Sequence, residues 1–294
     1  MATKEAIGIM YSRSPEARSL AEALGERLDL RAPSWVRSAS DEEGLEACMG
    51  QTRVVISVGG DGTILRAARA AAPHDVPVLG INMGRLGFMT ELRADEALLG
   101  VSRYLRGEQV WVEERAMLQA TVIPAATRGK QQVFHALNDV VVARGGLPRL
   151  LHIATELNGT PLTTYFADAV IVATATGSTG YALAAGGPIL HAASQDILVV
   201  PVAPHVSLGT ALVLPSDTVI TLEVKTDVPA VVSVDGLYDV AVTPGDIVQV
   251  QRSPYTARFL RARDPKHFYA TLIQRLGLIP GARSERPSEG PGGR

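Results

Sequence analysis

Cysteine is almost absent from this chain of 294 residues, which contains only Cys48. A lone thiol excludes an internal disulfide and fits a reducing compartment, and we expect it to serve packing and not nucleophilic chemistry. Hydrophobic runs of membrane-spanning length are also missing, and Met1–Glu5 lacks the apolar run of a signal peptide. We therefore expect a cytoplasmic protein with no membrane partner.

The charge is nearly balanced, with a net charge of -2 and a pI of about 6.3. A balanced charge gives no support for a nucleic-acid partner, which would require a broad basic face. The six histidines are scattered, without metal-ligand spacing to one another or to the cysteine. We therefore expect no metal site built from protein side chains alone. The fingerprints G-x-G-x-x-G and G-x-x-x-x-G-K-[ST] are missing too, so the usual nucleotide loops are excluded.

A glycine-rich turn organises the chain. Gly59-Gly-Asp-Gly-Thr63 lies between a buried strand, Val54–Val58, and a helical segment, Leu65–Ala72, which Pro73 ends. Glycine permits positive φ and close approach of a ligand, and the turn's amides with the helix N-terminus form a phosphate cradle. The cradle residues are predicted to be Gly59, Gly60, Gly62 and Thr63, with Arg66 one turn further along.

Asp61 is the exception in this cradle because a carboxylate repels phosphate. Its presence suggests that it holds a metal-bound phosphate or takes a proton from an attacking hydroxyl. The alternative is an ordinary turn, since Gly and Asp both favour turns.

Strands and helices alternate in the first 108 residues. Expected strands at Ala6–Met10, Val54–Val58 and Val76–Ile81 are separated by helices, one of them starting at Ser14-Pro15. Further helices are expected at Asp41–Met49 and Asp95–Arg106. This order predicts a doubly wound α/β domain with a parallel sheet, in which ligands bind beyond the carboxyl ends of the strands. Both Gly59–Thr63 and Asn82–Phe88 fall there, and Phe88 could stack on a flat ring or belong to the core.

From residue 109 to 261 the pattern changes to short Val-, Thr- and Ile-rich runs separated by turn signals, such as the hairpin turn Asn158-Gly159. Many short strands at this spacing predict an all-β, sandwich-like domain. A last helix, 262–278, opens at Asp264-Pro265 and could pack back onto the first domain. The tail 279–294, rich in Pro, Gly, Ser and Arg, is predicted to be disordered.

Two segments of the second half carry candidate chemistry. Asn138-Asp139 precedes the strand Val140–Ala143, and an amide beside a carboxylate suits a base edge and ribose hydroxyls, although an Asx turn is an alternative. The segment Asp168–Pro188 leads a strand into Thr174–Tyr181, a dense patch of small hydroxyl residues and glycines. Such residues bring backbone donors close to a ligand, and their hydroxyls can bond phosphate and ribose.

Together these segments resemble the bacterial NAD kinases over the chain from Ala6 to Leu276. The resemblance rests on five motifs in order: Gly59-Gly-Asp-Gly-Thr63, Gly84-Arg-Leu-Gly-Phe88, Asn138-Asp139, Thr174–Gly187 and Ser233-Val-Asp-Gly236. The first motif is shared with lipid kinases and phosphofructokinase-like enzymes, whereas the combination is highly specific.

The resemblance implies an α/β domain and a β-sandwich domain with the active site between them. It implies transfer of the γ-phosphoryl of ATP to the 2′-hydroxyl of the adenosine ribose of NAD, in a homodimer or homotetramer whose subunits complete each other's NAD site. By resemblance Asp61 is the general base, and Mg²⁺ or another divalent cation arrives with the substrate phosphates. The implied NAD-binding residues are Phe88 against the adenine, Asn138 and Asp139 on the adenosine, Asp168 at the nicotinamide end, and Arg149, Thr176, Thr179, Gly180, Tyr181, Ala182, Leu183 and Ala184 around the dinucleotide pocket.

Some positions depart from the family pattern. Asp139 stands where the family usually has glutamate, while Ala175 and Gly180 loosen the hydroxyl-rich loop, and Ala182 and Ala184 replace common serines. These differences leave the preference for NAD or NADH open. The phosphate cradle likewise leaves open whether ATP or polyphosphate is the phosphate donor. The competing interpretations are a lipid or sphingoid-base kinase sharing the glycine turn, and a non-catalytic dinucleotide-binding sensor.

Overall fold

The computed structural model describes residues 4–84, 87–125, 130–146, 149–225, 229–264 and 267–276. The predicted disordered tail, 279–294, lies outside these residues. None of the helices within them is long and apolar enough to cross a membrane.

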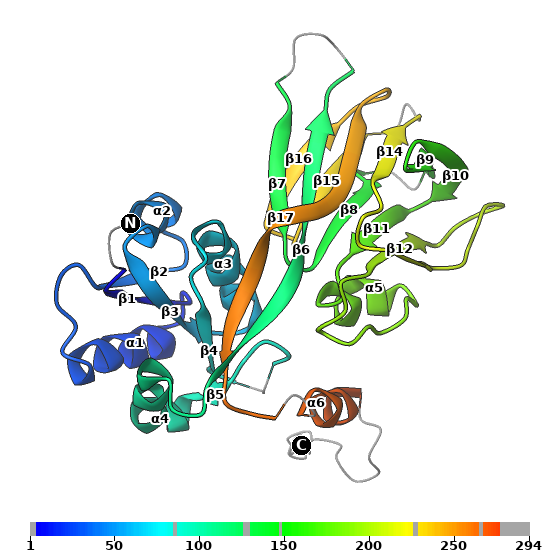
Figure 1. Ribbon diagram of the computed structural model, residues 1–294. Helices are drawn as coiled ribbons and strands as arrows, with labels where there is room; N and C mark the ends of the chain where they lie inside the picture. Colours follow the sequence, from blue (N-terminus) through cyan, green and yellow to red (C-terminus); the bar gives the residue numbers. More distant parts are fainter. Residues whose placement is uncertain are drawn as a thin grey trace, which may run out of the picture.

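Four parallel strands form the sheet of the first domain, in the order β2-β1-β3-β4 (Figure 1). Their bounds are Ala6–Tyr11 for β1, Trp35–Ser38 for β2, Thr52–Gly59 for β3 and Val78–Asn82 for β4, and the two-residue β5, Leu92–Arg93, pairs with β4. The chain passes from β1 outward to β2 and then returns to the other side of β1 as β3. The carboxyl ends of β1 and β3 therefore meet at the point where the winding direction reverses.

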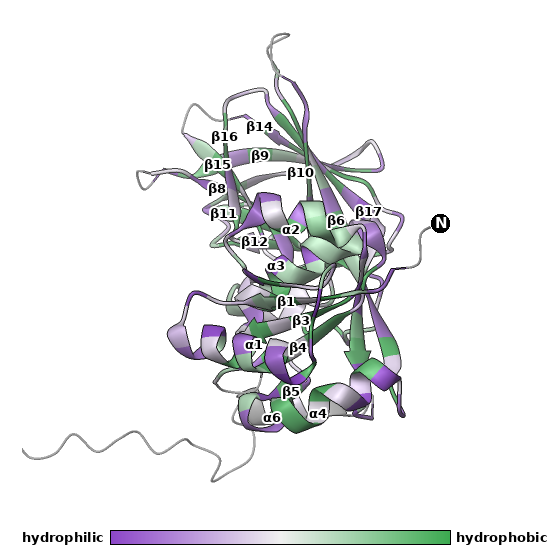
Figure 2. Ribbon diagram, turned by 90° about the vertical axis from the view of Figure 1, so that its left-hand side faces the viewer, coloured by the Kyte–Doolittle hydropathy of each residue, from purple (hydrophilic) through white to green (hydrophobic). Residues whose placement is uncertain are grey.

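Helices cover both faces of this sheet. On one face α1 (Pro15–Arg27) and α4 (Ala94–Arg106) enclose an apolar cluster, and on the other α2 (Glu42–Met49) and α3 (Asp61–Ala71) enclose a second. In Figure 2 purple and green residues alternate along α1, as expected for a helix with one buried side. The predicted doubly wound α/β domain is confirmed.

Local signals fix most of these elements. The Ser14 hydroxyl accepts a bond from the Ala17 amide at 3.2 Å, and the Asp41 carboxylate caps α2 through the Gly44 amide, also at 3.2 Å. The strand β2 was not predicted, because four residues with two of them polar give too short a pattern. The predicted start of the third helix at Leu65 is wrong, since α3 begins at Asp61 and is extended by a 3₁₀ turn, Ala72–His74.

The second domain is a sandwich of two antiparallel layers. One layer has the order β7-β6-β17-β14-β9-β10, with bounds Gln132–Ala136, Trp111–Ile123, Ile247–Arg261, Ile220–Val224, Leu151–Leu157 and Thr160–Ala167. The other has the order β13-β12-β11-β8-β15-β16, with bounds Leu212–Leu214, Ile197–Val202, Ala169–Ala173, Asp139–Arg144, Ala230–Val234 and Tyr238–Val242. A single apolar cluster fills the space between them, so the predicted all-β sandwich is confirmed.

Two long strands, β6 and β17, run from the sandwich into the first domain (Figure 1). Phe259 of β17 pairs with Val78 of β4, which joins the parallel sheet and one sandwich layer into an 11-stranded sheet. The predicted strands, Leu118–Ile123 and Ile247–Gln251, are too short, because charged residues in the extensions hide the strand pattern. The proposed division into 1–108 and 109–261 assigns both strands to the sandwich, although their ends belong to the sheet of the first domain.

The described part of the last helix, α6, spans His267–Leu276. Its Phe268 ring packs edge-on against His191 of the second domain, with ring centroids 4.8 Å apart. The same ring lines a cavity shared with the loop that follows β4. The helix therefore packs against the second domain and borders a cavity that the first domain also lines, where the sequence suggested packing on the first domain.

Candidate active site

The backbone of the glycine turn between β3 and α3 differs from the predicted conformation. None of its three glycines has a positive φ, and Gly60, which caps α3, has φ -93°. A Cβ on Gly59 would lie 2.4 Å from the Thr63 hydroxyl, so this glycine permits close packing inside the turn. At Gly60 and Gly62 no atom of the described residues lies within 4 Å of a Cβ position. These two glycines therefore leave open space above the turn.

That open space belongs to a cavity of about 400 Å³ at the carboxyl ends of β1 and β3. It is lined by Gly60, Gly62 and Thr63 of the turn, by Ser12 and Arg13 after β1, and by Arg66. Two guanidinium groups and the N-terminus of α3 make this cavity suitable for a polyanion such as a chain of phosphates. Arg66 also pairs with Glu42 at 3.2 Å.

Asp61 is the first residue of α3 and is half-buried. The loop after β4 passes directly over it, because a Cβ on Gly87 would lie 2.0 Å from the Asp61 Oδ1 atom. Only glycine permits this approach. On the far side of the loop, the charge of Asp61 also acts on the buried guanidinium of Arg115.

A tight turn between β15 and β16 connects this cavity to Asn138-Asp139. Asp235 and Gly236 both have positive φ, 53° and 62°, as in hairpin turns that favour Asp-Gly. The Asp235 carboxylate accepts bonds from the backbone amides of Leu137, Asn138 and Asp139 at 2.9, 2.7 and 3.0 Å. Leu237, two residues further along, lines the cavity above Gly60 and Gly62. The turn therefore places Asn138-Asp139 beside the cavity.

Asp139 is buried, with 7% of its surface exposed. Burial raises the pKa of its carboxyl to about 7, and the neighbouring Asp235 carboxylate adds to the shift. Burial likewise raises the pKa of Asp235, against the opposing effect of its three backbone hydrogen bonds. Near neutral pH, Asp139 can therefore either donate or accept a hydrogen bond.

The hydroxyl-rich segment packs directly against Asn138. The Thr174 amide donates to the Asn138 carbonyl at 2.9 Å, and a Cβ on Gly177 would lie 2.1 Å from that carbonyl oxygen. The structure thus brings together two candidate segments separated by more than thirty residues.

The hydroxyls of this segment donate mostly to backbone carbonyls of the protein itself. The Thr174 hydroxyl donates to the Leu137 carbonyl at 2.6 Å, and the Ser178 hydroxyl donates to the Ala175 carbonyl at 2.6 Å. The Thr179 hydroxyl donates to the Thr176 carbonyl at 3.0 Å. These groups stabilise the loop, which leaves backbone and carbon atoms as its main contact surface.

The residues after this loop differ in exposure. Thr176 is buried, Tyr181 is 46% exposed, and Gly180 and Ala184 are exposed. Leu183 is half-buried, whereas Ala182 is fully buried in the apolar cluster around β11 and β12. The short helix α5, Tyr181–Ala184, therefore presents its first and last residues to solvent.

Asp168 and Arg149 lie far from these groups within one chain. Asp168 precedes β11 and Thr174 follows it, so they are separated by roughly 20 Å at about 3.4 Å per strand residue. Asp168 pairs with Arg144 at 3.4 Å, and Arg149 is exposed on the connection that follows β8 at the same end. These predicted site residues are not brought together with Asn138-Asp139.

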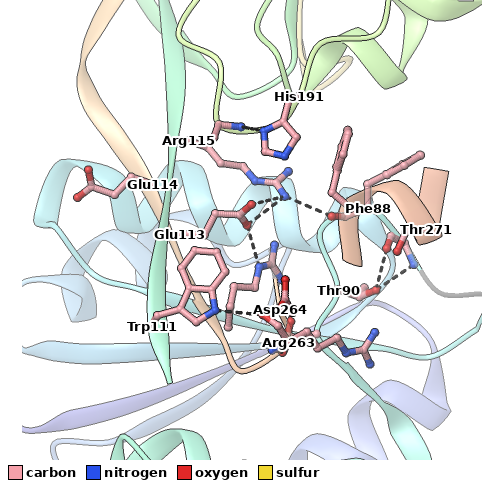
Figure 3. A pocket seen from close by; sticks show the side chains of 15 residues that line it. Phe88, Thr90, Trp111, Glu113, Glu114, Arg115, His191, Arg263, Asp264 and Thr271 are labelled. Carbon is pink, nitrogen blue, oxygen red and sulfur yellow. Dashed lines mark hydrogen bonds and ion pairs between the residues drawn. The ribbon is translucent and has the colours of Figure 1, made fainter. Parts of the chain in front are cut away.

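Phe88 follows Gly87 in the same loop. It lines a second cavity of about 280 Å³, together with Trp111, His191 and Phe268 (Figure 3). Its carbonyl accepts a bond from Arg115 at 3.4 Å.

Several residues at the site were not singled out from the sequence. Asp235 was quoted only as part of a motif, although the Asp-Gly pair signals a turn. Arg69 of α3 hydrogen-bonds the Tyr238 hydroxyl and lies 4.1 Å from the ring centroid, which fixes the β15–β16 turn to the first domain. Arg115 gave no signal in the sequence, since its role depends on contacts distant along the chain.

The chain is similar to known proteins over most of its length. Residues 7–109 match the family model described as the ATP-NAD kinase N-terminal domain, and residues 137–262 match the ATP-NAD kinase C-terminal domain. An NAD kinase of Dehalococcoides mccartyi is 42% identical over 272 residues, covering 92% of this chain and 95% of that protein. An NAD kinase of Chloroflexus aurantiacus is 38% identical over 274 residues, covering 92% and 98%.

Solved structures give the same result. The NAD kinase of Archaeoglobus fulgidus in complex with ATP has a TM-score of 0.72 at 25% identity, covering 94% of this chain and all of that one. Yeast NADH kinase complexed with NADH has a TM-score of 0.81 at 23% identity, covering 97% and 91%, and at that identity it shows the fold alone. None of these relatives favours a lipid kinase or a non-catalytic sensor.

Proposed function

The chain belongs to the NAD kinase family and phosphorylates NAD, and we propose that Asp61 is the general base of this reaction. The 2′-hydroxyl of the adenosine ribose gives its proton to the Asp61 carboxylate and attacks the γ-phosphorus of ATP. The bond from that phosphorus to the β–γ bridging oxygen breaks, and NADP and ADP are released. The observation that carries the assignment is the β15–β16 turn, which joins the cavity beside Asp61 to Asn138-Asp139.

The donor phosphates are assigned to the cavity above Gly60 and Gly62. Arg13, Arg66 and the N-terminus of α3 supply the positive charge there. ATP and polyphosphate share the phosphate chain that these groups would bind, so the donor is decided by assay.

A divalent cation would arrive with these phosphates. Among the described residues no group of three or more His, Cys, Asp or Glu side chains could hold a metal. Asp61, which stands in the chain between the cavity-lining residues Gly60 and Gly62, fits a Mg²⁺ ion that is bound by one or two carboxylates, phosphate oxygens and water. When bound, the cation would neutralise charge on the phosphates.

The acceptor is assigned to the space beside Asn138 and Asp139. Asp139 would bond ribose hydroxyls, and the backbone around Thr176–Ala184 would line the dinucleotide. Phe88 would contact the adenine from the Gly87 loop. Alignment of the two substrates, more than acid–base chemistry, then supplies most of the rate.

Asp61→Asn tests the base directly. We expect a folded protein whose turnover falls by about 10²–10⁴-fold, the usual contribution of a positioned base. The measurement is an endpoint assay with ATP, Mg²⁺ and NAD, read by a dehydrogenase that accepts only NADP, with NADH and polyphosphate in parallel. Turnover near that of wild type in this variant would refute the assignment.

Asp168 and Arg149 are proposed to act on the NAD site of a neighbouring subunit, at its nicotinamide end, in a homodimer or homotetramer. Their separation from Asn138-Asp139 within one chain supports this proposal. If it is correct, co-expressed Asp61→Asn and Asp168→Ala chains should recover activity that neither variant has alone, because one mixed site is intact. Lack of recovery in mixed oligomers, verified by differential tagging, would place Asp168 elsewhere.

A further inference from the structure

The loop that faces Asp61 is fastened from behind by two arginines. Arg115 Nη2 donates to the Phe88 carbonyl at 3.4 Å, and Arg261 Nη1 donates to the Met89 carbonyl at 3.0 Å. Gly87 precedes both carbonyls and touches the Asp61 carboxylate, with no room for even a methyl group between them. A shift of these carbonyls would therefore move the surface against which Asp61 rests.

The two arginines belong to a buried and charge-balanced network. Both oxygens of Glu113 accept from Arg115, at 3.2 and 3.1 Å, and Glu113 Oε2 also accepts from Arg261 at 2.8 Å. Arg261 pairs with Glu91 at 3.5 Å. The side chains of Arg115 and Arg261 are only 5% and 8% exposed. Figure 3 shows Glu113 pointing toward Arg115, while Glu114, the next residue on β6, points the other way.

Arg115 is not fully explained by this network. Its buried Nε has no hydrogen-bond partner among the described residues. A buried donor left without an acceptor costs about 1–3 kcal/mol, and such local conflicts concentrate at functional sites. The same guanidinium also interacts electrostatically with Asp61. The described contacts thus connect Arg115 to the base both through the Gly87 loop and through its charge.

We propose that Arg115 is a positioning residue for Asp61. It holds the Gly87–Met89 backbone against the Asp61 carboxylate and attracts that carboxylate with a fixed positive charge. This inference rests on the proposed role of Asp61 as the base. Arg115 lines the cavity beside Phe88 but is not assigned a substrate contact in this scheme, so its loss should lower kcat more than it weakens the binding of NAD.

The test uses variants that avoid leaving a buried charge unpaired. Arg115→Met with Glu113→Gln removes one charge of each sign and keeps Arg261 opposite Glu91. Arg115→Lys with native Glu113 keeps the charge but loses the guanidinium Nη2 that reaches both Glu113 and the Phe88 carbonyl. The matched control is Arg258→Met with Glu114→Gln, a more exposed pair at 3.2 Å on the same two strands.

For the Arg115/Glu113 variant we expect kcat to fall by about 10–100-fold, the effect of misplacing a reacting group by about 1 Å. The KM for NAD and the Kd for NADP should change less than about threefold, with Arg115→Lys intermediate and the control equal to wild type. Introduced into Asp61→Asn, the same pair of changes should lower the residual single-turnover rate far less than it lowers that of wild type.

The outcomes separate this inference from the proposed function. Loss of turnover in Asp61→Asn with unchanged kcat in the folded Arg115/Glu113 variant overturns the inference and leaves the base assignment standing. Equal losses from that variant with and without Asp61 also overturn it, because Arg115 would then act independently. Near-normal turnover in Asp61→Asn overturns the base assignment and the inference together.

Discussion

Two acids, Glu113 and Asp139, have surroundings that shift the pKa values of their carboxyls in opposite directions. Glu113 lies between Arg115 and Arg261, and although burial works against it, these two charges hold the pKa of its carboxyl below the usual value. Asp139 lies beside Asp235, and burial together with that second acid raises its pKa to about 7. Two carboxyl groups thus behave differently. Glu113 is a fixed anion, whereas Asp139 titrates near neutral pH.

The contrast indicates a division of labour. The Glu113 network is balanced and fastens the loop over Asp61, so it behaves as a scaffold. The pair Asp139–Asp235 is unbalanced and lies where the ribose is proposed to bind. A buried acid kept in an unfavourable setting is a common feature of ligand sites, because a substrate hydroxyl can satisfy it.

The largest effect on stability is expected from Glu113→Ala. It leaves two buried guanidiniums without their shared carboxylate, and breaking such a pair costs about 3–5 kcal/mol of unfolding free energy. Urea unfolding at pH 7 measures the change, with Glu114→Ala as the exposed control on the same strand. Because the pKa of Glu113 is lowered in the folded state, its contribution is present above the usual glutamate pKa of 4.5 and is lost as pH falls below it. A loss below about 1 kcal/mol would show that the network is not a scaffold.

A smaller effect is expected from Asp235→Ala. Three backbone amides would lose their acceptor, and we expect a loss of about 2 kcal/mol together with a raised KM for NAD. Thermal unfolding and initial-rate kinetics measure both. Asp239→Asn, an exposed acid on the same hairpin, is the control. An unchanged KM in the folded variant would separate the turn from the acceptor site.

The smallest effect, with the opposite sign, is expected from Asp139→Asn. The folded pKa of about 7 exceeds the ordinary value of 3.8, so the folded state keeps a proton that the unfolded chain releases. Wild-type stability should therefore fall as pH rises from about 4 to about 7 and stay level above that. The variant should be more stable than wild type at pH 8, and the difference should disappear as the pH falls toward 4. Equal stability at pH 8 would refute the raised pKa.

The elements of both domains could be predicted from the sequence where the signals are local. The cap at Ser14, the helix expected at Asp41–Met49, the hairpin at Asn158-Gly159 and the switch from helical to strand patterns are confirmed. The extents of β6 and β17 could not be predicted, because three charged residues, Glu113, Arg115 and Arg261, lie within these strands and are accommodated there by pairing with one another.

The features of the candidate site likewise divide into those that local sequence signals reveal and those that they do not. Gly59–Thr63, Asn138-Asp139 and Thr174–Tyr181 stand out because small and polar residues interrupt apolar runs. The internal use of the Thr174 and Ser178 hydroxyls could not be read from composition, since a hydroxyl gives the same signal whether it bonds a ligand or its own loop.

By itself the sequence determined the order of strands and helices, the glycine turn with its single carboxylate, and the resemblance that suggested the reaction. Each depends on residues close together in the chain, where backbone preferences and apolar spacing act. Only the tertiary structure decided that Asp235 caps Asn138, that Gly87 touches Asp61, and that Arg115 lies behind that contact. Those contacts join residues far apart in the chain, and the charge and burial they create exist only once the chain has folded.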